Sequence, residues 1–382
     1  MLVENAARLK KIYVVAGEAS GDLHGANLIR HLKARAQTPL EIYGVGGEKI
    51  RSTGARGFYD LAHFHVTGFT AAIKKLPQYQ KASKTILANI AEARPDLVVL
   101  IDNPGFNLHL AKKIHSLGIP IVYFIAPQLW AWAPERVFKI KKYVSKVLVV
   151  FQFEKKFFEE HGVPVAWVGH PLKDLVETRV DAGTDARRKT VGRLVSLMPG
   201  SRKGEIKVLF PIFLEAARRI RGALPGTAFA VIKAPTMPRE VYEERLKKVD
   251  FPVQIVDKYA YDVVRESELA IACSGTATLE CAILGTPMLI ANRVSLVTFL
   301  AAKSLLRVDW IGLPNLILGE KKFPELLQYD ATPQKIAAEA VRMLTEKNAH
   351  EAMKRDCEEA SKRIGERGAS VRAADEILSL LS

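Results

Sequence analysis

Short apolar runs alternate with helical patterns along the whole chain. In the first half, runs of four or five apolar residues predict strands at residues 12–16, 97–101, 121–125 and 147–150. These runs lack the apolar–polar alternation of a strand with one face in water, so we expect parallel sheets with helices on both faces. The segments between the strands, such as residues 108–117, have the pattern of helices.

The same pattern begins again in the second half. The predicted strands there are residues 194–198, 228–232, 253–256, 269–272 and 288–291. We therefore predict an α/β protein with an N-terminal Rossmann-like domain (residues 1–170), a C-terminal Rossmann-like domain (residues 171–340) and a C-terminal helical segment (residues 341–382) that packs back across the domains. Two Rossmann-like domains whose parallel sheets face each other across a cleft form the architecture called GT-B.

The composition is that of a globular protein with an excess of basic residues. Of 382 residues, 48% are hydrophobic and 25% are charged, which is ordinary for a globular domain. The formal net charge is +15, from 56 lysines and arginines against 41 aspartates and glutamates. No zinc-finger, RRM or KH signature is present, which disfavours nucleic acid as the partner. Anionic lipid surfaces and phosphorylated ligands remain as partners, beside a basic surface that is simply solvated.

The sequence gives no indication of export, membrane spanning or metal binding. The N-terminus lacks the apolar core of a signal peptide, and no run approaches the ~20 apolar residues that span a bilayer. Cys273, Cys281 and Cys357 have neither metal-ligand nor disulfide spacing, so we interpret them as reduced cysteines of a cytoplasmic protein. We expect no metal and no bound cofactor.

Two turns in the second half have the composition of an anion-binding site. Residues 199–202 and 274–276 each follow a predicted strand, contain glycine and open a predicted helix, whose first backbone N–H groups are free to bind phosphate. Arg202 adds a permanent positive charge. Glu280 lies four residues after Thr276, on the same helical face, and is placed to accept hydrogen bonds from a ribose diol. The predicted UDP contacts are Gly200, Ser201, Arg202, Ser274, Gly275, Thr276 and Glu280.

Asp102 follows the strand predicted at residues 97–101 and is expected at the edge of the sheet that faces the cleft. A single carboxylate there suits an inverting sugar transfer, in which one general base removes the proton of the attacking hydroxyl. Retaining glycosidases use two carboxylates close together. The alternative is an aspartate that forms a turn before Pro104 and Gly105.

Other polar and aromatic residues of the first half follow strands as well. The loop at residues 17–22 is either part of a ligand site or a tight turn in which Asp22 is the helix N-cap. Trp130 and Trp132 either face a ligand or pack in the core. The predicted acceptor-binding residues are Glu18, Ser20, Asp22, Asn107 and Trp130.

Residues 66–84 combine an apolar helical face with lysines. This combination is typical of a peripheral protein that rests in a lipid interface, although a plain amphipathic surface helix has the same pattern. The segment at residues 137–142 has the same character. The predicted membrane contacts are Phe69, Ile73, Lys74, Lys75 and Leu76. A further segment, residues 314–316, is predicted to be a loop.

These motifs, in this order, resemble the lipid-A-disaccharide synthases, a GT-B family of outer-membrane lipid A assembly. The matching stretches are residues 16–22, 102–107, 130–132, 136–140, 153–155, 199–202, 274–281 and 313–316. The resemblance is strong over residues 13–328 and weak over the helical tail. Each motif alone has low specificity, whereas the ordered set is highly specific.

The resemblance implies a metal-independent, inverting transfer. UDP-2,3-diacylglucosamine would donate its sugar to the 6-hydroxyl of 2,3-diacylglucosamine 1-phosphate (lipid X), which yields the β-1,6-linked disaccharide 1-phosphate and UDP. By position, Asp102 corresponds to the family's proposed base and Arg202 to its diphosphate-binding arginine, while Glu280 and Asn315 correspond to nucleotide contacts. Acylated substrates imply a peripheral protein at the inner face of the inner membrane, held by anionic lipids. The oligomeric state stays open, a homodimer included.

The chain departs from the family at two positions. Gly105 and Ala71 stand where the family often has acidic residues, which bears on how the polar head of the acceptor is held. Another GT-B enzyme that uses a UDP-sugar is the alternative, such as a UDP-N-acetylglucosamine 2-epimerase or the peptidoglycan N-acetylglucosaminyltransferase. The lysine-rich amphipathic segment argues against an epimerase. A basic nucleic-acid-binding module, from a different class, would show salt-dependent DNA retention without UDP binding.

Overall fold

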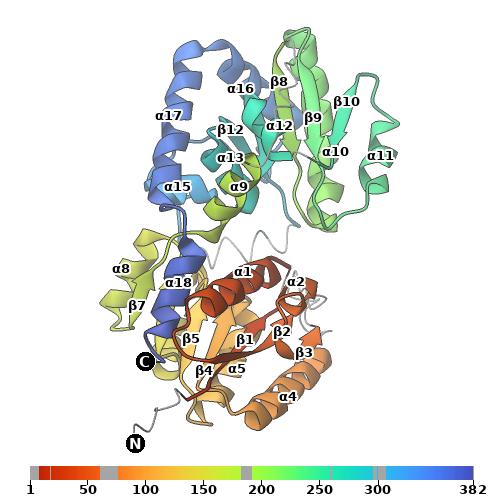
Figure 1. Ribbon diagram of the computed structural model, residues 1–382. Coiled ribbons are helices and arrows are strands. Elements are labelled where there is room, and N and C mark those ends of the chain that lie inside the picture. The colour runs from red at the N-terminus through yellow and green to blue at the C-terminus, as the bar shows by residue number, and fades with distance from the viewer. Residues whose placement is uncertain are drawn as a thin grey trace, which may run out of the picture. The chain divides into compact units, whose positions relative to one another are not determined.

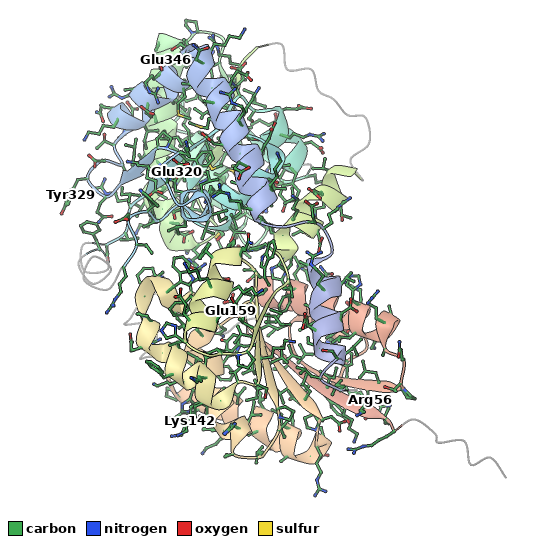
Figure 2. All side chains as sticks on the ribbon, turned by 90° about the vertical axis from the view of Figure 1, so that its left-hand side faces the viewer. Arg56, Lys142, Glu159, Glu320, Tyr329 and Glu346 are labelled. Atoms are coloured by element: carbon green, nitrogen blue, oxygen red, sulfur yellow. The ribbon has the colours of Figure 1, made fainter. Side chains whose placement is uncertain are left out.

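The computed structural model describes residues 8–17, 19–60, 76–181, 192–258, 260–295, 299 and 307–381. The chain forms two compact units. Unit 1 comprises Met1–Pro171 and Gly365–Ser382, and unit 2 comprises Leu172–Ile364. In each unit a sheet is covered by helices (Figure 1), and side chains fill the space between them (Figure 2).

Unit 1 is built on a sheet of seven parallel strands. They are β1 (Lys10–Ala16), β2 (Leu40–Gly46), β3 (Arg56–Asp60), β4 (Leu97–Ile101), β5 (Ile121–Phe124), β6 (Lys146–Val149) and β7 (Val165–Trp167). Their spatial order is β3-β2-β1-β4-β5-β6-β7. All residues of β4, and residues 12–16 of β1, are fully buried. Burial on both faces explains why these strands are continuously apolar.

Helices cover both faces of this sheet. They are α1 (Ala19–Arg35), α2 (Glu48–Arg51), α4 (Leu76–Ala93), α5 (Pro104–His115), α6 (Leu129–Trp132), the 3₁₀ turn η1 (Pro134–Arg136), α7 (Val137–Tyr143), α8 (Gln152–Glu160) and α18 (Ala369–Leu378). Successive residues of β1 point to opposite faces. Ile12 and Val14 therefore join the core beneath α1 and α18, whereas Tyr13 and Val15 join the core beneath α4, α5 and α7.

Unit 2 repeats the design with six parallel strands. They are β8 (Leu194–Met198), β9 (Ala228–Ile232), β10 (Val253–Val256), β11 (Leu269–Cys273), β12 (Met288–Asn292) and β13 (Glu325–Leu327). Their spatial order is β10-β9-β8-β11-β12-β13. The helices are α9 (Pro171–Asp181), α10 (Lys203–Ala223), α11 (Glu240–Leu246), α12 (Ala260–Glu266), α13 (Thr276–Leu284), α15 (Leu313–Leu318), α16 (Pro333–Thr345) and α17 (Lys347–Arg363). The fold class, two Rossmann-like α/β units with parallel sheets, is confirmed.

The C-terminal helices are divided between the two units. Helix α16 packs on α10, and α17 packs on α13 and α15, so both belong to unit 2. Helix α18 packs on α1 in unit 1, where Arg372 donates a hydrogen bond to the carbonyl of Val168 (2.8 Å) and Asp375 pairs with Arg35. Residues 341–382 are therefore not one separate segment, because the chain returns to unit 1 at Gly365.

Several local predictions need correction. The sequence pattern missed β2, β3, β7 and β13. The helix predicted at residues 108–117 spans Pro104–His115, with proline at its first position, where the absent N–H is not needed. Residues 314–316, predicted as a loop, lie in the short helix α15. Within the described part of the chain, we find no helix that combines the length and the apolar character needed to cross a membrane.

Candidate functional site

The strand order places four loops at the ligand-binding edges of the two sheets. In an open parallel sheet, ligands bind beyond the carboxyl ends of the strands, at the switch point where the strand order reverses. This point lies between β1 and β4 in unit 1, and between β8 and β11 in unit 2. The loops after these four strands contain Gly17, Asp102, Arg202 and Gly275. The predicted motifs of each unit thus lie together at its own switch point.

Unit 2 has a cavity of about 700 Å³ at its switch point. The cavity is lined by the predicted UDP contacts Gly200, Ser201, Arg202, Ser274, Gly275, Thr276 and Glu280. Sequence reasoning missed the further lining residues Arg179, Glu205, Lys233, Asp257, Lys258 and Tyr261. Cavities that hold small ligands are typically ~300–1,000 Å³, so this volume suits a nucleotide.

The start of α13 is the first anion-binding element of the cavity. Its N-cap, Gly275, has φ 133°, in a backbone region that side chains rarely adopt. A Cβ atom at Gly275 would have no neighbour within 4 Å, so backbone conformation and not space requires glycine here. Thr276 is exposed in the first turn, where free N–H groups and the helix dipole favour a negative charge. This turn therefore presents donors to a phosphate.

Glu205 organises the second turn. Its Oε2 atom accepts hydrogen bonds from the backbone N–H groups of Ser201 (3.0 Å) and Arg202 (3.1 Å). Its Oε1 atom accepts one from Arg202 Nη1 (3.1 Å). A glutamate three residues after an N-cap has the spacing of a capping box, but Arg202 stands where that motif has serine or threonine, so the motif was not recognisable in the sequence.

The position of Glu205 changes how the second turn meets an anion. A Cβ atom on Gly200, which has φ 113°, would lie 2.5 Å from Glu205 Oε2, so glycine lets the carboxylate reach the turn. The N–H groups of Ser201 and Arg202 are occupied by this carboxylate, which corrects the prediction that Ser201 offers its N–H to phosphate. The group that this turn offers to a diphosphate is the Arg202 guanidinium, whose side chain is 58% exposed.

Glu280 lies one turn deeper in α13 and is bonded to Tyr261 of α12. Tyr261 Oη donates to Glu280 Oε1 (3.0 Å), and the Arg179 guanidinium lies 5.8 Å from the Tyr261 ring centroid. Burial raises the pKa of Glu280 to about 7, against the smaller lowering effects of the Tyr261 hydrogen bond and the Arg179 charge. Burial, with the nearby charge of Glu280, also raises the pKa of Tyr261. Glu280 therefore changes its charge near neutral pH.

A charged group from the loops after β9 and β10 completes the wall. Lys233 Nζ lies 3.7 Å from Asp257 Oδ1 and donates to the carbonyl of Met237 (3.0 Å). Arg239 Nη1 donates to Asp257 Oδ2 (2.5 Å). Of these residues, Lys233 and Asp257 line the cavity; they follow different strands and belong to no local motif, so only the fold brings them together.

In unit 1, the loop after β4 has an unusual backbone. Asp102 (φ 47°) and Asn103 (φ 44°) both lie in the left-handed region, which aspartate and asparagine tolerate better than other side chains. Asn107 Nδ2 donates to the carbonyls of Ile101 (3.0 Å) and Asp102 (2.7 Å), and Tyr123 Oη donates to the carbonyl of Asp102 (2.7 Å). Backbone strain that is held by such bonds clusters at functional sites.

Asn107 was predicted to bind the acceptor, but the structure gives it another task. Its side chain is fully buried, and its amide group supports the turn that carries Asp102. Asp102 itself is half-buried and directly follows β4, at the position predicted for it. Asn107 is therefore a residue that positions Asp102, the predicted base, and not the ligand contact that was predicted.

The loop after β1 packs against the Asp102 turn. A Cβ atom on Gly17 would lie 2.2 Å from Asn103 Nδ2, so only glycine allows the two loops to approach this closely. Ser20 is exposed at the start of α1, where contact with an acceptor stays a prediction. Glu18 lies outside the described residues.

Asp22 does not bind a ligand in the way predicted. It is buried, and its carboxylate accepts hydrogen bonds from the N–H groups of Gly47 (2.8 Å), Ile50 (2.9 Å) and Lys49 (3.0 Å). These groups belong to the start of α2, so Asp22 stabilises that helix from its own place in the first turn of α1. The alternative, that Asp22 caps its own helix, is wrong as well.

Trp130 combines packing with a hydrogen bond. Its ring meets that of Phe153 edge-on, with centroids 4.8 Å apart, and its Nε1 donates to Glu154 Oε1 (3.2 Å). Glu154 is buried, and burial raises its pKa to about 7 although Val150 and Phe151 also donate to it. Because Trp130 is half-buried, a contact between its remaining surface and the acceptor stays a prediction.

Asn315 does not line the cavity in the way a nucleotide contact would require. Its side chain is fully buried. Nδ2 donates to Glu325 Oε1 (2.8 Å) and to the carbonyl of Phe323 (2.9 Å), while Oδ1 accepts from the N–H groups of Phe323 (2.8 Å) and Lys322 (2.9 Å). The Asn315 side chain therefore does not contact the nucleotide as predicted. It has a structural role beside β13.

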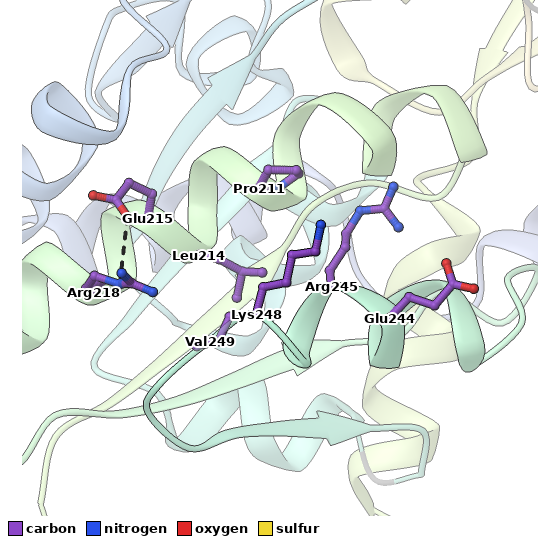
Figure 3. Close-up of a pocket in the computed structure, with 8 residues that line it drawn as sticks. All are labelled: Pro211, Leu214, Glu215, Arg218, Glu244, Arg245, Lys248 and Val249. Carbon is purple, nitrogen blue, oxygen red and sulfur yellow. Dashed lines mark ion pairs between the residues drawn. The ribbon is translucent and has the colours of Figure 1, made fainter.

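The predicted membrane contacts Phe69, Ile73, Lys74 and Lys75 lie outside the described residues, and Leu76 is the first residue of α4. A hollow of about 620 Å³ between α10 and α11 contains none of the predicted site residues (Figure 3). Its walls mix apolar groups with charges of both signs, among them Glu215 and Arg218 at 3.8 Å.

Comparison with known proteins identifies the family. Residues 12–378 match the family described as lipid-A-disaccharide synthetase. The lipid-A-disaccharide synthase of Trichlorobacter lovleyi is 38% identical over 377 residues, which cover 98% of this chain and 98% of that relative. The lipid-A-disaccharide synthase of Myxococcus xanthus is 37% identical over 374 residues, 97% of each chain. This chain belongs to the lipid-A-disaccharide synthase family.

Membership of this family makes the chain a glycosyltransferase of lipid A biosynthesis. The fold also resembles solved structures with UDP ligands. One is the S. aureus MnaA–UDP complex (TM-score 0.70, 13% identity, 97% of both chains covered). Another is the Neisseria meningitidis UDP-GlcNAc 2-epimerase bound to UDP-GlcNAc (TM-score 0.66, 13% identity, 97% of this chain and 100% of that one). At such low identity the likeness shows the fold alone.

Proposed function

We propose that this chain transfers 2,3-diacylglucosamine from UDP-2,3-diacylglucosamine to the 6-hydroxyl of 2,3-diacylglucosamine 1-phosphate. The products are the β-1,6-linked disaccharide 1-phosphate and UDP. The supporting observation is the placement of Asp102 at the switch point of unit 1, and of Arg202 and Gly275 at that of unit 2, in a chain of the lipid-A-disaccharide synthase family. Acceptor activation and donor binding are then the tasks of different units.

In this proposal, the cavity of unit 2 binds the UDP part of the donor. The free N–H groups at the start of α13 and the exposed Arg202 guanidinium bind the diphosphate. Glu280, one turn deeper, accepts hydrogen bonds from the ribose hydroxyls, and Tyr261 holds its carboxylate in place. Negative charge grows on the β-phosphate as the bond to the sugar breaks, so donors that are already oriented toward it stabilise the transition state.

Asp102 is the proposed general base. The 6-oxygen of the acceptor attacks the anomeric carbon from the side opposite UDP, and Asp102 takes the hydroxyl proton while the bond to UDP breaks. At the anomeric carbon one bond forms on the face opposite the one that breaks, so the configuration inverts, and the hydroxyl proton ends on Asp102. Asn107 and Tyr123 support this role by holding the carbonyl of Asp102, which fixes the backbone from which the carboxylate projects.

The proposal includes a location. A cytoplasmic protein held peripherally at the inner face of the inner membrane would meet both acylated substrates, and a net charge of +15 favours an anionic leaflet. Phe69, Ile73 and Leu76, with Lys74 and Lys75, are the contacts proposed from the sequence.

The reaction is tested by incubating the protein with the two lipid substrates and analysing the products by mass spectrometry. The expected result is the disaccharide 1-phosphate together with one UDP for each disaccharide. Conversion of UDP-N-acetylglucosamine to its 2-epimer, without any disaccharide, would show that the chain is an epimerase and overturn the proposal. The Arg202→Ala variant is the matched control, because it should lose product while its unit 2 stays folded.

A further inference from the structure

A strongly basic surface lies on helices α5 and α7 of unit 1. Helices α5 and α7 carry five lysines, two in α5 and three in α7, and neither helix contains an aspartate or a glutamate. None of the five lysines forms an ion pair with a carboxylate that the structure describes, whereas Lys155 and Lys156 of the neighbouring α8 pair with Glu159 and Glu160. Among the described residues, positive charge is therefore uncompensated on α5 and α7, whereas on α8 it is paired with carboxylates.

We define the α5–α7 surface by six residues, Lys112, His115, Phe138, Lys139, Lys141 and Lys142, all of which are exposed. Contacts between rings connect its parts. His115 of α5 meets Tyr143 of α7 with centroids 5.5 Å apart, and Phe138 of α7 meets His161, just after α8, at 5.9 Å. The surface is thus continuous from the end of α5 across α7.

Helix α7 is anchored by one face and presents the other to its surroundings. Val137 and Ile140 are fully buried in the core of unit 1. Phe138 is 63% exposed although it is fully apolar, and Lys139, Lys141 and Lys142 are exposed around it. Figure 2 shows Lys142 on the outside of unit 1, at the edge away from the sheet. An exposed phenyl ring among lysines that pair with no described carboxylate is the pattern by which a helix rests on an anionic membrane.

We infer that the α5–α7 surface docks on an anionic lipid bilayer, with Phe138 in the interface and the lysines against lipid phosphates. Charge complementarity selects this occupant. Lipid phosphates match lysines that no described carboxylate neutralises, and only an apolar medium rewards the burial of Phe138. This inference deepens the proposed function, because it names a second contact with the membrane that supplies the acylated substrates. It does not depend on residues 69–76.

The test is co-sedimentation of the full chain with vesicles, without substrate. Vesicles of phosphatidylcholine alone are compared with vesicles that also contain phosphatidylglycerol. In the triple variant Lys139→Gln, Lys141→Gln and Lys142→Gln, we expect partitioning onto anionic vesicles to fall on the order of 100-fold, since each lysine near such a surface contributes about fivefold. Phe138→Ser alone should reduce partitioning about tenfold. Thermal unfolding checks that both variants stay folded.

The matched control removes the same charge from another exposed surface. Lys247→Gln, Lys248→Gln and Lys321→Gln change three exposed lysines of unit 2 and should leave partitioning within about twofold of the unmodified protein. Equal losses in the control and in the α7 variant would overturn the inference, because net charge alone would explain binding. Unchanged binding of the Phe138 and α7 lysine variants would overturn it as well.

Two further measurements distinguish lipid docking from nucleic-acid binding and from failure of the proposed reaction. Lysine-dependent retention on DNA, without binding to vesicles, would assign the α5–α7 surface to nucleic acid and overturn a lipid partner. Disaccharide synthesis is measured separately with detergent-dispersed substrates. If that activity is absent from the unmodified protein while vesicle binding depends on α7, the proposed reaction fails and the docking surface stands. If activity is present and vesicle binding does not depend on α7, the docking surface fails alone.

Discussion

Replacing Glu205 by glutamine is expected to weaken donor binding through Arg202. In the structure, one carboxylate oxygen holds the N–H groups of Ser201 and Arg202, and the other holds Arg202 Nη1. Glutamine keeps one oxygen for the turn but directs an amide NH₂ group at the guanidinium, so two donors face each other. Because the Arg202 side chain is 58% exposed, the lost ion pair is worth about 1 kcal/mol, which corresponds to roughly fivefold in binding.

The assay is the initial rate of disaccharide formation at varied UDP-sugar and saturating acceptor, together with calorimetry of UDP binding. Glu205→Gln should raise the KM for the donor and the Kd for UDP about fivefold, with a smaller effect on kcat. Arg202→Ala removes the charge itself and should lower kcat/KM by about 2–4 kcal/mol, or ~30–1,000-fold. In the Arg202→Ala background, Glu205→Gln should have no further effect, because it acts through that arginine.

Two results for UDP affinity would refute this reasoning. Tighter UDP binding in Glu205→Gln would mean that the carboxylate mainly repels the diphosphate, and losses that add in the double variant would mean that Glu205 acts independently of Arg202. Glu215→Gln is the matched control, since Glu215 lies on the same helix with both of its ion pairs, to Arg218 and Arg219, outside the cavity. Its KM for the donor should equal that of the unmodified protein.

Three other residues of the two units give predictions of their own. Asp102→Asn keeps the shape of the side chain but not its basicity, so kcat should fall by about 10²–10⁴ with UDP affinity nearly unchanged; a variant that keeps most of its activity would exclude Asp102 as the base. Burial raises the pKa of Glu280 to about 7, so its carboxylate takes up a proton below that pH and UDP affinity should fall there. In calorimetry across pH 7, the UDP affinity of Glu280→Gln should depend less on pH, since only the protonation of UDP itself then contributes. Equal pH dependence in both proteins would contradict the ribose contact. Gly105→Asp should fold normally, because a Cβ atom there has no neighbour within 4 Å and an acidic residue near the start of α5 gains about 0.5 kcal/mol; a loss of thermal stability in calorimetry would contradict this.

Hydrophobic patterning predicted the strands whose burial is uniform. Strands β4 and β11 are buried at every residue, so their sequences are apolar throughout and need no tertiary information to be recognised. The pattern missed β2, in which Gly44 and Gly46 interrupt the apolar run. A Cβ atom at either position would lie within 2.7 Å of the Ile50 side chain of α2. Glycine is therefore required at both positions by the packing of α2 on the strand, and no local sequence pattern reveals that packing.

The loops of the candidate site were predictable because a parallel sheet places ligands after its strands. Asp102, Arg202 and Gly275 follow β4, β8 and β11 in the sequence, and the reversal of strand order then brings the loops of each unit together. Lys233 also directly follows a strand, β9, so the same rule would have pointed to it, although no motif marks it. Tyr261 was not predictable in this way, because it lies within α12 and only the fold of unit 2 brings it to the cavity.

The sequence by itself determined the family, the two Rossmann-like units and the loops that hold the chemistry, because these depend on local patterns of residue type. Tertiary structure decided the task of each polar side chain. Asp22, Asn107 and Asn315 have the chemistry of ligand-binding residues, yet all three are buried and bonded to the backbone. The same carboxylate or amide group can form hydrogen bonds with a ligand or with the protein backbone. Burial selects between them, since a polar group removed from water must find its partner within the protein, and burial depends on residues distant in the sequence.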